Sequence, residues 1–321
     1  MKDKNISWVE KYRPSNLDEI SAQTNVVKSL KASLQTKNIP HLIFFGPSGC
    51  GKTSTILALS KELFGENYSD RIIELNASDE RGINVIREKI KTYAKQSIKN
   101  IDGVPPWKII ILDEADTMTS DSQFALRRIM EQYSKITRFC IICNYHNKII
   151  DPIISRCSLF RFKPVESEEI VKKLLFICEK ENLKCSEKLL EKIVGICRGD
   201  LRKAINLLQK CNNSYGENIN EELLDEISGI IPSAKFNKLI EYVVNKNTNQ
   251  VDKMVNDLIL EGYSMVNQVM IFHNYIVDSN FTSEQKSNIL CKLAEIDQGL
   301  IKGCDEYIQF MKLVYHIMIT I

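Results

Sequence analysis

The sequence contains Gly46-Pro47-Ser48-Gly49-Cys50-Gly51-Lys52-Thr53, which matches the phosphate-loop pattern G-x-x-x-x-G-K-[ST]. An apolar run precedes it, and a helical stretch from Thr53 to about Leu63 follows. Glycines in such a loop let successive backbone N–H groups point inward at a polyphosphate. The Lys52 ammonium supplies a charge for the β- and γ-phosphates, and the Thr53 hydroxyl supplies a ligand for Mg²⁺. The stretch therefore predicts a site for ATP with Mg²⁺.

Around this loop, residues 41 to 162 alternate short apolar runs with helical stretches. The runs do not alternate polar with apolar residues, which is typical of parallel strands buried on both faces. Strands separated by helices of about a dozen residues predict βαβ units with helices on both faces of the sheet. The expected fold is α/β with a parallel five-stranded sheet, its strands at His41–Phe45, Arg71–Leu75, Lys108–Leu112, Arg138–Cys143 and Leu159–Phe162.

The pattern changes at Lys163-Pro164, after which only helical periodicity remains. A chain of 321 residues suits two or three domains. Ile231-Pro232 marks a second boundary, because the residue before a proline disfavours helix. We therefore expect an α/β domain at 1–164, a small helical domain at 165–230 and a C-terminal helical domain at 231–321.

Composition and charge exclude several classes of protein. The net charge is 43 − 41 = +2, which rules out a uniformly basic nucleic-acid coat but allows a local basic patch. Ten scattered cysteines form no disulfide framework, and the close pair Cys140 and Cys143 lies in a strand expected to be buried. The chain shows no signal-peptide pattern at its start and no apolar run of about 18 residues. We expect a cytosolic or nuclear protein with no membrane partner.

The second half of the phosphate site is predicted at the end of the third strand, in Ile111-Leu112-Asp113-Glu114. Ligands of open α/β sheets bind at the carboxyl ends of the strands, so both acids should face the phosphate loop. We expect Asp113 to hold Mg²⁺, directly or through water. Glu114 would orient and deprotonate the water that attacks the γ-phosphate.

A basic segment follows the second strand. Residues 81 to 99 carry six basic side chains and one acid, and in a helix over 83–98 the residues Arg87, Lys91 and Lys95 would form one stripe. Such a stripe suits contact with a phosphate backbone without reading of bases. On charge alone, an ordinary solvated helix face is the better explanation.

Several motifs together resemble the small subunits of replication factor C, the sliding-clamp loader of eukaryotes, which is of the AAA+ type. They are the phosphate loop, Trp8-Val9-Glu10-Lys11-Tyr12-Arg13-Pro14, Glu74-Leu75-Asn76-Ala77-Ser78-Asp79-Glu80-Arg81-Gly82, Ala125-Leu126-Arg127-Arg128 and Ser155-Arg156-Cys157. The resemblance runs from about Ser7 to the C-terminus. It implies an AAA+ ATPase domain, a helical lid and a C-terminal helical collar. This chain departs from the family at Ser48 and Cys50, where proline and threonine are usual.

The resemblance also implies roles for particular residues. Val9, Tyr12 and Arg13 would line the adenine side, while Asn144 and Arg202 would serve as the first and second sensors. Arg156 matches the arginine finger that reaches a neighbouring subunit's ATP. The expected catalytic residues are Lys52, Asp113, Glu114, Asn144, Arg156 and Arg202, and the expected Mg²⁺ ligands are Thr53 and Asp113. The expected nucleotide contacts are Val9, Tyr12, Arg13, Gly46, Pro47, Ser48, Gly49, Cys50, Gly51, Lys52, Thr53, Ser54, Asn144 and Arg202.

Partners follow from the same resemblance. It implies a hetero-pentamer with other replication factor C subunits, which binds the sliding clamp and primer-template DNA in the nucleus. DNA contacts are expected at Arg81, Arg87 and Lys91, and a clamp contact at Tyr93-Ala94. Two alternatives remain, namely a homo-oligomeric AAA+ remodeller or helicase-like ATPase and a scaffold subunit that does not hydrolyse ATP. The intact Lys52, Asp113, Glu114 and Asn144 argue against a scaffold.

Overall fold

The computed structural model describes residues 6–20, 23–36, 38–78, 83–96, 101, 103–215 and 221–321. The chain forms two compact units, Met1–Gln209 and Lys210–Ile321, whose boundary falls within helix α10 (Leu201–Tyr215). The site that the sequence predicts lies in the first unit.

The first unit is built on a five-stranded sheet with the order β2-β3-β4-β1-β5, in which every pair is parallel. The predicted parallel sheet is therefore confirmed: β1 has the predicted bounds, and the other four strands differ from theirs by one or two residues at one or both ends. Arg71 ends a short helix and does not begin β2. The strands are β1 (His41–Phe45), β2 (Ile72–Asn76), β3 (Lys108–Asp113), β4 (Thr137–Cys143) and β5 (Cys157–Arg161).

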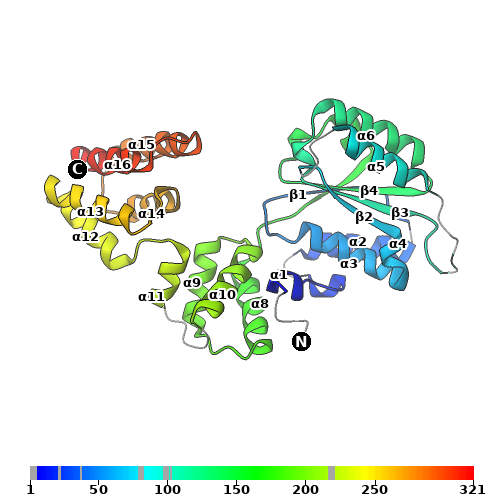
Figure 1. Ribbon diagram of the computed structural model, residues 1–321, viewed down its shortest axis with the longest axis horizontal. Helices are drawn as coiled ribbons and strands as arrows, with labels where there is room; N and C mark the ends of the chain where they lie inside the picture. Colours follow the sequence, from blue (N-terminus) through cyan, green and yellow to red (C-terminus); the bar gives the residue numbers. More distant parts are fainter. Residues whose placement is uncertain are drawn as a thin grey trace. The chain divides into compact units, whose positions relative to one another are not determined.

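Helices cover both faces of this sheet (Figure 1). Ile109 and Ile111 pack with the side chains of α2 (Thr24–Thr36) and α3 (Lys52–Phe64). Ile110 and Leu112 pack with those of α5 (Ile83–Lys95) and α6 (Ser120–Tyr133). The same alternation separates Cys140 from Cys143, which are buried in the two different cores. Both faces of the central strands are thus covered, which explains why the strands read as continuous apolar runs.

Helices α8 to α10 form a three-helix layer after the sheet. Its core contains Ile170 and Leu174 from α8, Ile193 from α9 and Leu208 from α10, all of them fully buried. The helices of the first unit are α1 (Trp8–Lys11), α2 (Thr24–Thr36), α3 (Lys52–Phe64), α4 (Tyr68–Arg71), α5 (Ile83–Lys95), α6 (Ser120–Tyr133), α7 (Asp151–Ile154), α8 (Ser167–Lys180), α9 (Glu187–Cys197) and α10. Short 3₁₀ turns lie at Leu17–Glu19, Gly65–Asn67, Ala115–Thr117 and His146–Lys148.

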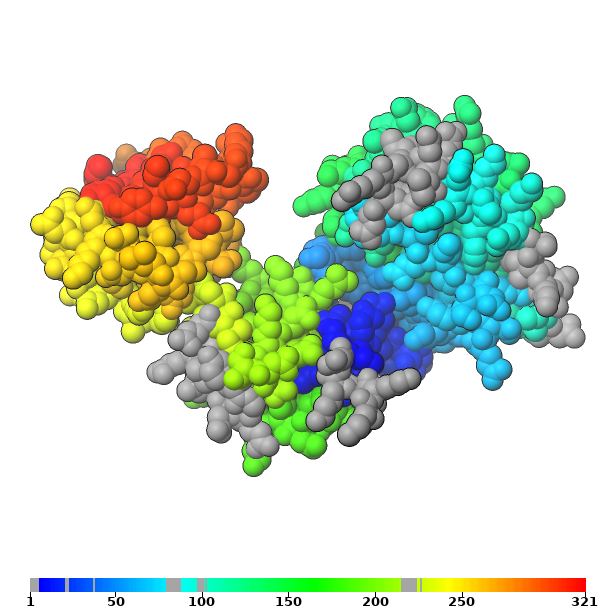
Figure 2. Space-filling model, viewed as in Figure 1, coloured from blue at the N-terminus to red at the C-terminus, as the bar shows by residue number. Residues whose placement is uncertain are grey.

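The N-terminal helix α1 packs against this layer, and Figure 2 shows the two in contact, blue against green. The Trp8 N–H donates to Gln209 Oε1 at 3.0 Å, and the ring of Tyr12 meets Phe176 edge to face. Burial raises the pKa of the Tyr12 hydroxyl, which donates to Glu181 Oε1. These contacts bring the Val9–Arg13 segment to the same side of the unit as α8 and α10.

The second unit is entirely helical in the residues described. Its core is one apolar cluster drawn from α12 to α16 and includes Phe236, Phe272 and Phe310. The buried Gln268 side chain accepts from Ile231 N and donates to Gly229 O, which fixes the segment that enters α12. The helices are α11 (Glu221–Ser228), α12 (Ser233–Val244), α13 (Thr248–Leu260), α14 (Met265–Asp278), α15 (Ser283–Ile301) and α16 (Glu306–Thr320).

None of the helices in the described ranges is long and apolar enough to cross a membrane. The boundaries expected at 164/165 and 230/231 stay a prediction. The compact units divide the chain at a different place, since they group α8, α9 and most of α10 with the sheet.

Candidate nucleotide site

The phosphate loop connects β1 to α3 and depends on glycine at several points. Gly46, Gly49 and Gly51 have φ of 149°, 66° and 92°, in a region that other residues rarely adopt. A Cβ atom on Gly46 would lie 2.3 Å from Phe162 O, so any larger residue at this position would clash with that backbone oxygen. Gly51 precedes the first turn of α3, which leaves the N–H groups of that turn directed at the loop. This arrangement is the one that binds phosphate groups.

Lys52 is almost completely buried at the start of α3, with 8% of its surface exposed. Its ammonium donates to Gly46 O at 2.7 Å, Pro47 O at 2.8 Å and Asn144 Oδ1 at 2.9 Å. These three acceptors use all three donors of the side chain. The lysine is therefore held in the loop, next to the amide predicted to act as first sensor.

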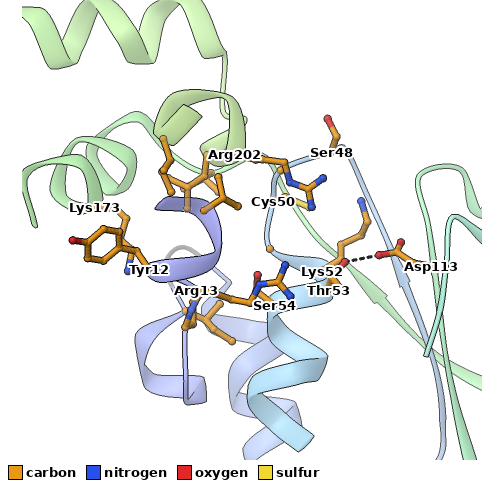
Figure 3. Close-up of a pocket in the computed structure, with 18 of the residues that line it drawn as sticks. Tyr12, Arg13, Ser48, Cys50, Lys52, Thr53, Ser54, Asp113, Lys173 and Arg202 are labelled. Atoms are coloured by element: carbon orange, nitrogen blue, oxygen red, sulfur yellow. Dashed lines mark hydrogen bonds between the residues drawn. The ribbon is translucent and has the colours of Figure 1, made fainter. Parts of the chain in front are cut away.

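Thr53 and Asp113 meet at the carboxyl end of the sheet. Thr53 Oγ1 donates to Asp113 Oδ2 at 2.7 Å, and Figure 3 shows both beside Lys52. A hydroxyl and a carboxylate are the oxygen ligands that Mg²⁺ prefers, and Mg²⁺ completes its shell with water and substrate phosphates. Within the described ranges no three His, Cys, Asp or Glu side chains form a cluster that could hold a metal ion. The two predicted ligands are thus brought together.

Glu114 follows directly in a left-handed backbone conformation, with φ 54° and ψ 35°. This conformation costs a residue with a side chain about 1 kcal/mol or more, and Asn182, Arg198 and Lys246 adopt it as well. The Glu114 N–H donates to Asp113 Oδ1 at 2.8 Å. The strand end is further tied to β4, because Asp116 Oδ2 accepts from Asn144 N and Tyr145 N, both at 3.3 Å.

One cleft runs from this loop to α1, α8 and α10. All the residues predicted to contact nucleotide line this cleft except Gly46 and Pro47. The carbonyl oxygens of these two loop residues accept hydrogen bonds from the Lys52 ammonium. Its lining is Val9, Tyr12, Arg13, Pro14, Glu19, Ile20, Ser48, Gly49, Cys50, Gly51, Lys52, Thr53, Ser54, Asp113, Glu114, Cys143, Asn144, Val165, Lys173, Leu201, Arg202 and Ile205.

The end of the cleft remote from Lys52 combines apolar and charged groups. Val9 and Ile20 come from the N-terminal segment and Ile205 from α10, which suits an apolar base. Arg13 pairs with Glu10. Burial lowers the pKa of the Lys173 ammonium, an effect partly opposed by the carboxylate of Glu19.

The lid side of the cleft carries Arg202, which is exposed in α10 and lies near Ser48 and Cys50 in Figure 3. Burial raises the pKa of the Cys50 thiol, whose sulfur donates to Pro47 O at 2.9 Å. This cysteine is therefore a poor nucleophile, although it lies in the phosphate loop. Ser48 bonds to Asp200, just before α10.

Arg156 is not part of this cleft. Its Nη2 lies 2.7 Å from Glu131 Oε1, and its Nη1 donates to Pro152 O at 2.7 Å. Of the other predicted catalytic residues, Lys52, Asp113, Glu114, Asn144 and Arg202 all line the cleft. The structure thus separates the predicted finger from this chain's own site, and its action on a neighbour stays a prediction.

The predicted DNA contacts are only partly described. Arg81 lies outside the described residues, and Arg87 lies in α5 with its side chain outside them. Lys91 is exposed on α5. The Ala94 side chain is fully buried against the sheet and Tyr93 is half-buried, and the expected contact of this segment with the clamp stays a prediction.

Three sequence profiles match successive parts of the chain. The ATPase family associated with various cellular activities (AAA) matches residues 42–165, and the RCF1/5-like AAA+ ATPase lid domain matches residues 172–211. The replication factor C C-terminal domain matches residues 231–316.

Curated relatives cover almost the whole chain. Replication factor C subunit 2 of Saccharomyces cerevisiae is 46% identical over 97% of this chain and 92% of its own length. The chain belongs to the replication factor C small-subunit family. Replication factor C subunit 4 of Homo sapiens is also 46% identical, over 99% and 89% of the two chains, and the small subunit of Archaeoglobus fulgidus is 46% identical over 94% of both. The segments at residues 199–205 and 229–232 resemble the corresponding parts of human subunit 4.

Solved structures of other proteins share the fold of this chain. A single-substitution variant of RuvB from Thermotoga maritima has a TM-score of 0.54 at 16% identity, over 78% of this chain and 89% of that one. A second RuvB from the same organism, described as a Holliday junction branch migration motor, has a TM-score of 0.53 at 17% identity, over 73% and 79%. At this identity the likeness shows the AAA+ fold alone, so it does not favour a remodeller over a replication factor C ATPase subunit.

Proposed function

We propose that this replication factor C subunit binds ATP with Mg²⁺ and hydrolyses it within a hetero-pentamer that opens the sliding clamp and loads it on primer-template DNA. The observation that carries the proposal is the convergence of Lys52, Thr53, Asp113 and Asn144 at the ends of three neighbouring strands. Membership of an ATPase family supports the reaction class, and the intact site argues against a subunit that only serves as a scaffold.

Each residue has a separate task in this proposal. Lys52 places its positive charge at the β- and γ-phosphates, exchanging carbonyl partners for phosphate oxygens. Glu114 accepts the proton of the attacking water, and Asn144 helps to position that water. Thr53 and Asp113 would hold Mg²⁺, which neutralises charge on the phosphates when it is bound.

The two arginines act on different nucleotides. Arg202 reaches the nucleotide of its own chain from α10, so that a bound nucleotide draws the lid helices toward the phosphate loop. Arg156 reaches a neighbouring subunit's ATP and stabilises charge there as the phosphate is transferred. Hydrolysis then depends on assembly, and we propose that the assembly works in the nucleus.

The decisive variant is Glu114→Gln, which preserves the size of the side chain and removes the base. In a reconstituted assembly whose other ATP sites are inactivated, we expect ATP to bind and to stay uncleaved. Single-turnover hydrolysis should fall by about 10²-fold or more. Bound ATP and ADP are counted by chromatography of the quenched complex.

The matched control is Glu66→Gln, which changes an exposed glutamate outside the cleft. We expect this variant to hydrolyse ATP at the normal rate. If Glu114→Gln also retains the normal rate, the assignment of the base is wrong. If the unmodified chain binds no ATP, the proposed function itself fails.

A further inference from the structure

The tip of the phosphate loop is bonded to the lid helices through a side chain. Ser48 Oγ donates to Asp200 Oδ2 at 3.0 Å, across 152 residues of sequence. A main-chain bond accompanies it, because Leu201 N donates to Gly49 O at 3.3 Å. The loop and the start of α10 therefore make two direct contacts.

Asp200 is also the residue that directly precedes α10. Its Oδ1 accepts from Lys203 N at 2.9 Å, in the manner of an N-cap. A carboxylate is favourable here because the N-terminus of a helix carries a partial positive charge. One carboxylate thus fixes the start of α10 with one oxygen and the tip of the loop with the other.

The fit between the two segments is close. A Cβ atom on Gly49 would lie only 1.9 Å from Asp200 Oδ1, so glycine lets the carboxylate approach the loop. Arg202, two residues further along α10, lines the cleft. The contact at Asp200 therefore sets the distance between the phosphate loop and the arginine that faces it.

The Ser48 bond depends on a hydroxyl that the usual residue of the family motif lacks. Proline is usual at this position in the family, and a proline side chain has no hydroxyl to donate. The Ser48 oxygen points away from Lys52 in Figure 3, so its side chain is not aimed at the phosphate position.

We propose that the Ser48–Asp200 hydrogen bond is a latch that holds α10 against the phosphate loop and slows the release of nucleotide from this subunit. Ser48 and Asp200 act as positioning residues through Arg202. The inference rests on the proposed function, because it requires a nucleotide in the cleft. Closing the cleft before binding removes part of the free-energy cost of closing it afterwards, so the latch also increases affinity.

The test is the dissociation rate of a fluorescent ADP analogue from the reconstituted assembly, with the other nucleotide sites inactivated. Ser48→Ala should release the analogue about 3- to 10-fold faster, the range expected for one hydrogen bond to a charged acceptor in a partly exposed setting. Ser48→Pro should be equally fast. Ser48→Thr, which retains the hydroxyl, should release at the original rate.

A double-mutant cycle tests the partner. In an Asp200→Ala background the acceptor is gone, so Ser48→Ala should cause no further change in the release rate. The latch is overturned if Ser48→Ala releases at the original rate, if Ser48→Thr is as fast as Ser48→Ala, or if the two substitutions act additively. Loss of all binding by the unmodified chain would reject the proposed function instead, and Lys52→Ala shows what such a loss looks like.

Discussion

At the scale of a single residue, Arg156 is held by contacts that cost little free energy to break. Its guanidinium pairs with Glu131, and the two side chains are 39% and 40% exposed. Ion pairs this exposed contribute about 0–1 kcal/mol to stability. Arg156 can therefore leave Glu131 at small cost when a phosphate of a neighbouring subunit offers a stronger partner.

Arg156→Ala should leave ATP binding by this chain intact and lower the turnover of the neighbouring site. The expected loss is on the order of 10³-fold, as for an arginine that stabilises the transferred phosphate. Equilibrium binding of labelled ATP and single-turnover hydrolysis, measured site by site in the assembly, separate the two effects.

Arg161→Ala is the control, because it removes an exposed arginine of the same region that does not line the cleft. That variant should hydrolyse ATP normally at both sites. Reduced affinity of this chain's own site in Arg156→Ala would show that the arginine acts within its own subunit.

Some residues of the cleft could not be predicted from the sequence. Lys173 lies on an amphipathic helix, where a lysine reads as an ordinary solvated side chain, and only the packing of α8 brings it to the cleft. Asp200 is similarly distant in sequence from Ser48. By contrast, Lys52, Thr53 and Asp113 were predictable, because a local pattern places them at the strand ends.

At the scale of elements, α5 is held at its end by a buried cation. The Lys108 ammonium donates to Tyr93 O and to Gln96 O, the latter at 2.7 Å, and these are among the last carbonyls of the helix. Burial lowers the pKa of Lys108 to about 8. A positive charge is favourable at a helix C-terminus. From the sequence, Lys108 was only the first residue of a strand, and no local pattern indicated this contact.

The exposed face of α5 is the surface predicted to contact DNA. Lys91 is exposed there, and the sequence places Arg87 one turn earlier on the same stripe. The double variant Arg81→Ala, Arg87→Ala should weaken the stimulation of ATPase activity by DNA. Phosphate contacts release counterions, so the salt dependence of that stimulation should also become flatter by roughly one unit of log–log slope per lost contact.

The measurement is the DNA concentration for half-maximal stimulation at several salt concentrations, with basal ATP binding as the internal reference. Lys28→Ala with Lys31→Ala, on α2, is the matched control for loss of two positive charges. A slope equal to that of the unmodified chain would mean that the basic stripe is only a solvated surface.

At the scale of the whole molecule, the sheet and its helices were predictable because buried parallel strands read as continuous apolar runs. Ile109–Leu112 is such a run, and both of its faces are covered. The compact units were less predictable. The Lys163-Pro164 boundary marks the end of strands in the sequence, but contacts such as Trp8 with Gln209 join the following helices to the sheet unit.

We propose above all that this chain works as one subunit of a hetero-pentameric clamp loader. Native mass spectrometry of the assembly isolated on this chain under mild conditions tests it most directly. We expect one copy of this chain together with four related but different chains, and nucleotide bound in the complex. A closed ring of identical copies would contradict it and would favour a remodeller built from this chain alone.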